Sequence, residues 1–315
     1  MAGLRSSRYV LSVLRSLLVI AGLLLCIYAG LLLMLWARQE RIVFQPPGPP
    51  YDEAKAERVE YAASDGQQLF AYVVSSGESR EQGTEGVRGD SALQPRPVTL
   101  LVFHGNAEIA AWSLPWAQEV ARRTGAVVVL AEYRGYAGLT GLPTYSSSKL
   151  DARAAYQYAR DALGAAPERT VIYGHSLGSA IGVELAAEIK PRSLLLEAPF
   201  TSARAMAARL GVPGVLPLWR AISRVHYDTR TRVAELETPV SVVHGDRDMV
   251  TPVHMGREVF QAARRKGDLL VLEGVGHNDV VETGGERYWE WLQRGMTGAT
   301  VLPEGVSPQS TGRNP

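Results

Sequence analysis

The sequence has 315 residues, with 33 Lys and Arg against 32 Asp and Glu, so its formal net charge at pH 7 is +1. This balance lacks the basic excess of a nucleic-acid binder, and a composition of 46% hydrophobic and 21% charged residues argues against a disordered chain. The single cysteine, Cys26, excludes an internal disulfide framework or a thiolate metal cluster within one chain, and the length predicts two domains or one large α/β domain with an appendage.

The first feature along the chain is an uncharged apolar run at residues 16–36, SLLVIAGLLLCIYAGLLLMLW. A helix of this length spans about 30 Å, the thickness of the hydrocarbon core of a bilayer. A cleaved signal peptide has a shorter apolar region, of about 7–15 residues, and ends at a small-x-small site. Ala29 and Gly30 are poor candidates for such a site because apolar sequence continues past them. The run therefore predicts a single transmembrane helix, with residues 1–40 as a membrane anchor and the bilayer as a partner.

Arginines flank this run on both sides. Arg5, Arg8 and Arg15 precede it, whereas Arg38 and Arg41 follow it. By the positive-inside rule, this bias predicts a cytoplasmic N-terminus and a main domain on the far side of the membrane. Residues 41–57 contain the run PPGPP, which favours an extended connector between anchor and domain.

Short apolar runs follow the connector and predict the strands of one domain over residues 58–295. Alternating apolar positions predict strands at 58–62 and 69–74, and the polar, Gly-rich segment 75–97 is interpreted as a surface loop. Six continuous apolar runs predict buried strands at residues 98–103, 126–131, 170–173, 193–196, 240–243 and 269–272. Between them, helices are predicted at residues 109–123, 148–163, 177–189, 253–266 and 286–293. This alternation predicts an α/β fold with a mostly parallel sheet and helices on both faces.

Residues 200–237 interrupt the alternation of strands and helices. The segment contains Pro213 and Pro217 and many large apolar residues, among them Met206 and Trp219. We interpret it either as a small apolar lid or as ordinary structure that covers the core. The Ser/Gly/Pro-rich residues 296–315 are expected to form a flexible tail.

The sharpest motif is Gly174-His175-Ser176-Leu177-Gly178, a G-x-S-x-G sequence between a predicted strand and a predicted helix. A serine at such a sharp turn is exposed at the carboxyl edge of the sheet, and the flanking glycines let neighbouring backbone pack closely. Ser176 is therefore the candidate nucleophile. The alternative is a plain strand–helix turn.

A serine nucleophile needs a base and a residue that orients the base. His277 lies in a Gly-rich loop after the last predicted strand, which makes it the candidate base rather than a histidine that only braces a loop. Asp246 and Asp248 both follow the strand at 240–243. We favour Asp248 as the orienting acid because it lies further into the loop, whereas an acid next to a strand end usually caps a turn. Glu197 and Asp279 are weaker candidates.

Acyl transfer also needs donors for the oxyanion that forms. The strand at 98–103 ends in His104-Gly105-Asn106-Ala107. The backbone N–H groups of Asn106 and of Leu177, the residue after the nucleophile, are the candidate oxyanion donors. The alternative is that this loop is only a tight connection.

These blocks resemble the α/β-hydrolase superfamily, and over residues 43–292 they resemble membrane-anchored hydrolases with a serine-aminopeptidase-like domain. The resemblance is carried in order by QERIVFQP, LVFHGNAE, EYRGYAGLTGLPT, VIYGHSLGSAI, LLLEAPFTS, HGDRDMVTP and VGHND. It implies an eight-stranded sheet, a Ser176, Asp248 and His277 triad, and oxyanion donors at Asn106 and Leu177. Glu132 and Ala137 depart from the family, where aspartate and glycine are frequent.

The expected function is hydrolysis of carboxylic esters or thioesters of lipid-like acyl substrates, without a metal or other cofactor. The alternatives are a serine peptidase of the aminopeptidase type, an acyltransferase, and a non-catalytic membrane-anchored binding protein. A peptidase would need a pocket for a charged amino terminus, and no acidic cluster in residues 200–237 suggests one. Serine at the turn also argues against relatives whose nucleophile is a carboxylate.

Overall fold

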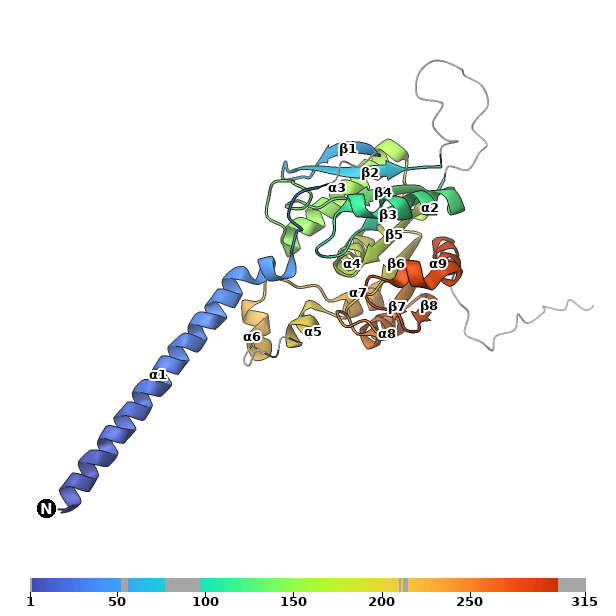
Figure 1. The fold of residues 1–315 in the computed structure, drawn as a ribbon. Helices are drawn as coiled ribbons and strands as arrows, with labels where there is room; N and C mark the ends of the chain where they lie inside the picture. The colour runs from blue at the N-terminus through green and yellow to red at the C-terminus, as the bar shows by residue number, and fades with distance from the viewer. Residues whose placement is uncertain (1, 52–55, 77–96, 210, 212–214, 300–315) are drawn as a thin grey trace, which may run out of the picture.

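The computed structural model describes residues 2–51, 56–76, 97–209, 211 and 215–299. Most of the loop expected at 75–97 and of the tail expected at 296–315 therefore lies outside the described residues. The described strands form one eight-stranded sheet in the order β1-β2-β4-β3-β5-β6-β7-β8 (Figure 1). Its strands are β1 Glu57–Ala62, β2 Gln68–Val74, β3 Thr99–Phe103, β4 Val127–Ala131, β5 Thr170–His175, β6 Ser193–Glu197, β7 Val240–Gly245 and β8 Lys266–Leu272.

The sheet is mostly parallel, as predicted. Strand β2 pairs antiparallel with both β1 and β4, and the pairs from β4 to β8 are parallel. The helices are α1 Ala2–Val43, α2 Leu114–Thr124, α3 Tyr145–Leu163, α4 Leu177–Ile189, α5 Ala203–Ala208, α6 Val215–Ile222, α7 Thr229–Glu235, α8 Val253–Ala262 and α9 Val280–Met296. The sheet and the helices together confirm the predicted α/β fold.

Helices cover both faces of the sheet because its central strands are apolar on both sides. In β3, Leu101 and Phe103 belong to a core shared with α3, α4 and α8, whereas Leu100 and Val102 belong to a core shared with α2 and α9. Successive side chains of a strand point to opposite faces, so a continuous apolar run supplies both cores.

Strand β8 differs from the prediction at its start. The predicted helix at 253–266 ends earlier, because α8 stops at Ala262 and Ala263 has extended backbone. Residues 266–268 begin β8 instead, although Lys266, Gly267 and Asp268 are not apolar. This strand is the edge of the sheet and is only partly buried, so polar residues are tolerated in it.

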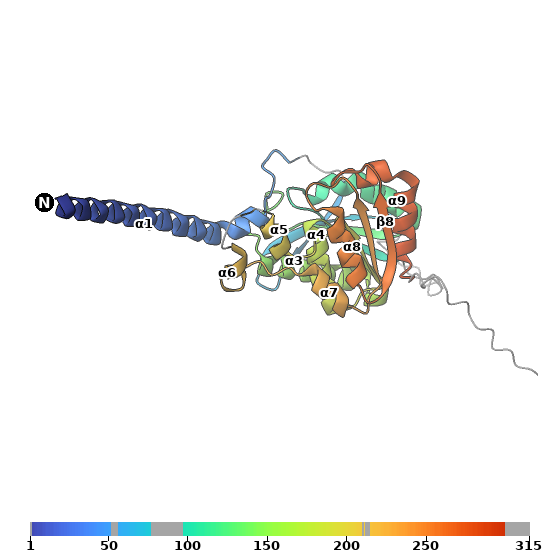
Figure 2. The same ribbon diagram turned by 90° about the horizontal axis from the view of Figure 1, so that it is seen from below.

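Helix α1 is continuous from Ala2 to Val43 and projects away from the rest of the molecule (Figures 1 and 2). It is long and apolar enough to cross a membrane over Val10–Val43, and that stretch is not buried inside the protein. The helix continues past the predicted span, since Arg38–Val43 contains no glycine or proline and Pro46 and Pro47 follow only later. Its last turns lie beside α6 (Figure 1).

Candidate active site

Ser176 lies at the sharp turn between β5 and α4. Its backbone has φ 50° and ψ −112°, a conformation that L-residues rarely adopt. Gly174 and Gly178 make this turn sterically feasible. A Cβ at Gly178 would collide with the carbonyl of Phe103, and a Cβ at Gly174 would collide with the carbonyl of Gly178. The strained turn therefore depends on close backbone contact between β5, α4 and β3.

The three side chains predicted to form a triad lie in one hydrogen-bonded line. The Nε2 atom of His277 is 3.0 Å from the Oγ of Ser176, and its Nδ1 atom is 2.6 Å from the Oδ2 of Asp248. The loops after β5, β7 and β8 supply these residues, so all three lie at the carboxyl edge of the sheet. With Nδ1–H donated to Asp248, the Nε2 atom can accept the proton of Ser176.

The carboxylate of Asp248 is fully buried and surrounded by donors. Its Oδ1 atom accepts hydrogen bonds from the backbone N–H groups of Val250 and Thr251, both at 2.8 Å. Burial alone would raise the pKa of Asp248, but hydrogen bonds from His244 and His277 outweigh it and hold the pKa far below its usual range. Asp248 therefore stays ionised and can hold the His277 ring in place.

His244 and Thr251 contact this carboxylate, and the sequence analysis gave neither of them this role. The Oγ1 of Thr251 lies 2.9 Å from Oδ2 of Asp248, and the Nε2 of His244 lies 3.2 Å from the same oxygen. The sequence signal was the short spacing of His244, Asp248 and Thr251 in HGDRDMVTP, which puts them at the end of β7 and in the loop that follows it.

The other acidic candidates do not contact His277 by a hydrogen bond that the described structure shows. The exposed Asp246 accepts the backbone N–H of Gly274 at 2.6 Å, a turn-capping role. Glu197 is buried at the end of β6 and accepts the hydroxyl of Tyr173, and Asp279 precedes α9 and is exposed. The geometry thus favours Asp248 among the four.

His175, next to the candidate nucleophile, forms a partly buried ion pair. Its Nδ1 atom is 3.0 Å from Glu108, and its ring centroid is 5.1 Å from that of His277. Burial would lower the pKa of His175, but the hydrogen bond and charge of Glu108 raise it to about 9. Burial would raise the pKa of the Glu108 carboxyl, but the hydrogen bond and charge of His175 lower it to about 2. The pair ties the loop after β3 to the nucleophile turn.

His104 and Glu132 form a second pair beside the site, and this pair is fully buried. The Nε2 of His104 is 2.8 Å from Oε1 of Glu132, whose other oxygen accepts the backbone N–H of Ala110. Glu132, one of the two departures from the family pattern, thus braces the loop after β3. Ala137, the other departure, has φ 46°, a left-handed conformation in which glycine is unstrained.

Both candidate oxyanion residues line the cavity that contains Ser176. Leu177 is the first residue of α4, and the first N–H groups of a helix have no partner within the helix. The side chain of Asn106 is held by two donors, the backbone N–H of Gln45 at 2.8 Å and the hydroxyl of Tyr136 at 2.9 Å. The segment directly after α1 thus steadies the loop that carries Asn106.

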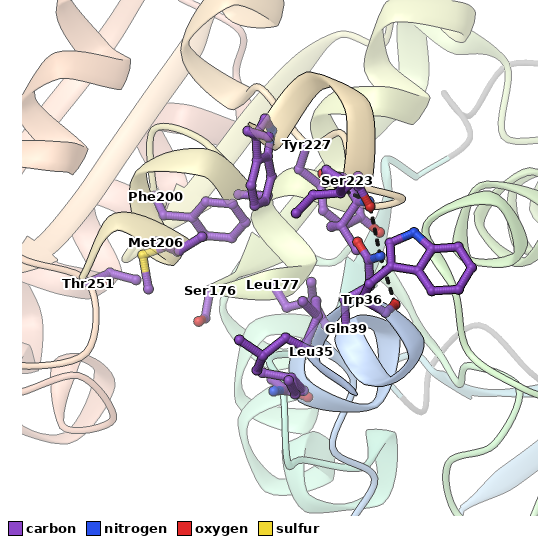
Figure 3. Close-up of a pocket in the computed structure, with 18 of the residues that line it drawn as sticks. Leu35, Trp36, Gln39, Ser176, Leu177, Phe200, Met206, Ser223, Tyr227 and Thr251 are labelled. Atoms are coloured by element: carbon purple, nitrogen blue, oxygen red, sulfur yellow. Dashed lines mark hydrogen bonds between the residues drawn. The ribbon is translucent and has the colours of Figure 1, made fainter. Parts of the chain in front are cut away.

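The cavity at Ser176 has a volume of about 320 Å³ and a mostly apolar lining (Figure 3). Phe200, Met206 and Tyr227 line it from the segment after β6, and Leu35 and Trp36 line it from α1 (Figure 3). None of its lining residues within the described ranges is acidic, and no group of three metal-ligating side chains occurs there. The contribution of α1 to this cavity was not predicted.

Comparisons with known proteins place these observations in a family. A model of the alpha/beta hydrolase family matches residues 99–236. An uncharacterized protein of Mycobacterium tuberculosis is 29% identical over 288 residues, 90% of this chain and 96% of that protein. Human alpha/beta hydrolase domain-containing protein 17B is 30% identical over 196 residues, 62% of this chain and 64% of that protein.

Solved structures share the fold at low sequence identity. An esterase of Pyrococcus furiosus has a TM-score of 0.59 at 17% identity and covers 80% of this chain and 99% of its own. An esterase of a Rhodococcus species has a TM-score of 0.53 at 18% identity, with 74% of this chain and 96% of its own covered. The fold of this chain is therefore the one that these esterases have.

Proposed function

The chain belongs to the α/β-hydrolase superfamily, and from this we propose that it is a serine hydrolase that cleaves carboxylic esters or thioesters of lipid-like acyl substrates. The observation that carries the proposal is the hydrogen-bonded line from Ser176 through His277 to Asp248. A serine hydroxyl is a weak nucleophile, and such a line of base and orienting acid is what activates it.

The reaction runs in two halves. The Oγ of Ser176 attacks the acyl carbon while Nε2 of His277 takes the hydroxyl proton, and the C–O or C–S bond to the leaving group breaks as His277 returns that proton to the alcohol or thiol. Water then attacks the acyl-enzyme while His277 takes its proton. The bond between the acyl carbon and Oγ breaks as His277 returns that proton to Ser176, and the carboxylic acid leaves. In both halves Asp248 stabilises the imidazolium, and the N–H groups of Asn106 and Leu177 are the proposed donors to the oxyanion.

The lining of the cavity supports an acyl substrate over a peptide. An aminopeptidase needs an acidic group to bind a charged amino terminus, and the described lining residues include none. Large apolar side chains such as Phe200 and Trp219 instead favour a hydrocarbon chain. The two solved structures described above are esterases, which agrees with this choice.

We place the enzyme at a membrane, with α1 as a single-pass anchor. The helix is long and apolar enough to cross a bilayer. The excess of arginine before the apolar run favours a cytoplasmic N-terminus and a catalytic domain on the opposite side. An enzyme held in this way meets acyl lipids at the bilayer surface.

Labelling with a fluorophosphonate tests the catalytic proposal directly. The reagent should phosphonylate wild-type protein at Ser176 with loss of fluoride, and Ser176→Ala should not react. Ser179→Ala is a matched control, since Ser179 is the neighbouring buried serine whose hydroxyl donates to the carbonyl of Ser176. Equal labelling of wild type and Ser176→Ala would overturn the assignment.

A panel of acyl esters, acyl thioesters and aminoacyl amides then tests the substrate class. A preference for the amides would contradict the proposed class of acyl esters and thioesters.

A further inference from the structure

We propose that the last turns of α1 form one wall of the acyl-chain site, so that the substrate is an ester or thioester whose medium or long acyl chain enters from the bilayer. The helix is then part of the substrate site as well as an anchor. This inference rests on the proposed function, because it takes Ser176 as the nucleophile at one end of the site.

One face of α1 lines the cavity. The α1 residues in its lining are Leu32, Leu35, Trp36, Gln39, Ile42 and Val43. Their spacing of three and four residues places them on a single side of a helix. Residues between them, such as Leu33 at 63% exposure, point away from the cavity. The way in which α1 packs against the domain therefore determines which of its faces lines the cavity.

Specific contacts hold α1 in this position. The side chain of Gln39 donates to the carbonyl of Ile222 at 3.0 Å and accepts the backbone N–H of Arg224 at 2.6 Å. The guanidinium of Arg224 lies 4.2 Å from the centroid of the Trp36 ring. Figure 3 shows Trp36 and Gln39 directly beside Ser223, with Leu35 on the side toward Ser176 and Leu177. These contacts join α1 to the end of α6 and fix the wall.

The chemistry of the walls suits a hydrocarbon chain. The rest of the lining includes the large apolar side chains of Phe200, Met206, Trp219 and Ile222, whereas Ser176 and Thr251 contribute hydroxyls. The volume of about 320 Å³ is at the lower end of the range for small-molecule sites, about 300–1,000 Å³. A narrow apolar site with a reactive hydroxyl at one end binds a chain by burying its methylenes and presents its carbonyl to the serine.

The position of the cavity along α1 indicates where the chain comes from. Leu32, Leu35 and Trp36 belong to the uncharged run at 16–36, whereas Gln39 and Ile42 follow it. The cavity therefore straddles the level at which the helix leaves the hydrocarbon core, where a tryptophan is favoured. An acyl chain that moves from the bilayer into this site stays in apolar surroundings, so only the ester group has to leave the headgroup region.

Chain-length selectivity in full-length protein tests the proposal. With protein in lipid nanodiscs, the ratio of kcat/KM for a ten-carbon to a four-carbon p-nitrophenyl ester should be at least about tenfold, since each buried methylene contributes up to about fourfold. Leu35→Trp fills the cavity and should lower this ratio at least about tenfold. Leu33→Trp, the matched control on the opposite face, should leave the ratio within about twofold of wild type. Equal ratios in the two variants would overturn the proposal.

A second measurement does not depend on a folded variant. A fluorophosphonate with a ten-carbon chain ending in a diazirine is attached to Ser176 of wild-type protein and then photolysed. Mass spectrometry should find crosslinks on residues 32–43 of α1. Reaction at Ser176 with crosslinks only elsewhere would overturn this inference and leave the proposed function standing. No reaction at Ser176 would overturn the proposed function, and this inference with it.

Discussion

Asp248 and Asp246 are two carboxylates separated by one residue, yet their surroundings differ. Asp248 is buried and bonded to His277, whereas the exposed Asp246 accepts a hydrogen bond from the backbone of Gly274. Asp248→Asn should lower kcat by about 10⁴-fold, because the neutral amide no longer holds the required tautomer of His277.

Asp246→Asn is the matched control for this prediction. It should change kcat by less than about tenfold, since the asparagine oxygen can still accept the N–H of Gly274. Ester hydrolysis by the two variants at saturating substrate measures both effects. A larger loss of kcat in Asp246→Asn than in Asp248→Asn would assign the orientation of His277 to Asp246 instead.

The His175–Glu108 pair predicts a pH dependence of stability. The pKa of His175 is raised from 6.5 to about 9, so its contribution is complete below pH 6.5 and is lost as the pH rises toward 9. The pKa of Glu108 is lowered from 4.5 to about 2, so its contribution is complete above pH 4.5 and is lost as the pH falls toward 2. The pair therefore stabilises the fold most between pH 4.5 and 6.5.

Urea unfolding of wild type and Glu108→Gln in detergent measures this contribution. The difference between their midpoints should be largest near pH 5.5 and should shrink by pH 9. Glu119→Gln serves as a control, because the partners of Glu119 are Arg122 and Arg123, which do not titrate in this range. A Glu108→Gln difference that stays constant from pH 5.5 to 9 would contradict the prediction.

The contact between α4 and β3 is the element that the nucleophile turn depends on. Gly178→Ala should destabilise the domain by about 3 kcal/mol or more, because the new Cβ meets the backbone carbonyls of Phe103 and His104, which cannot move as a side chain can. Urea midpoints measure the effect. Gly48→Ala, which adds a Cβ in open space, should shift stability by no more than about 0.5 kcal/mol. Similar urea midpoints for the two variants would show that the nucleophile turn tolerates a wider separation between α4 and β3.

Continuous apolar runs predicted six of the strands, because a strand buried on both faces needs apolar side chains on both, and alternating apolar positions predicted β1 and β2. The prediction failed at the start of β8, where Lys266, Gly267 and Asp268 are strand residues. An edge strand is buried less and therefore carries a weaker apolar signal. The candidates Ser176, Asp248 and His277 were chosen from their loop positions, and the structure brings their side chains within hydrogen-bond distance. The contact of Thr251 with Asp248, in contrast, depends on how the loop folds, which no pattern of residue types shows.

The packing of α1 against the domain could not be predicted from the sequence. Residues 16–36 are apolar on every side of the helix, so their periodicity marks no face that contacts protein. The contacts that select the face are made by Gln39 with Ile222 and Arg224, more than 180 residues apart in the chain. Only the three-dimensional arrangement shows that the anchor and the cavity share a wall.

The junction between α1 and α6 predicts a local protection from hydrogen exchange. The amide of Arg224 donates to the Oε1 of Gln39, so Gln39→Ala should speed exchange of that amide about tenfold, the effect of losing one such hydrogen bond. Gln45→Ala is the control, because the Gln45 side chain bonds only Ile42 among the described residues. Exchange measured by mass spectrometry on peptides covering residues 222–227 gives both values. Unchanged exchange in Gln39→Ala would show that α1 does not hold this junction.

Because α1 forms one wall of the cavity, the substrate concentration that determines the rate is the concentration within the membrane. A chain that reaches Ser176 sideways from the bilayer is sampled in two dimensions, at its mole fraction among the surrounding lipids. Tethering to the same surface replaces a bulk encounter by a local effective concentration. Rates should then follow the composition of the membrane, and inert lipid should act as a diluent even when the total amount of substrate in the sample stays the same.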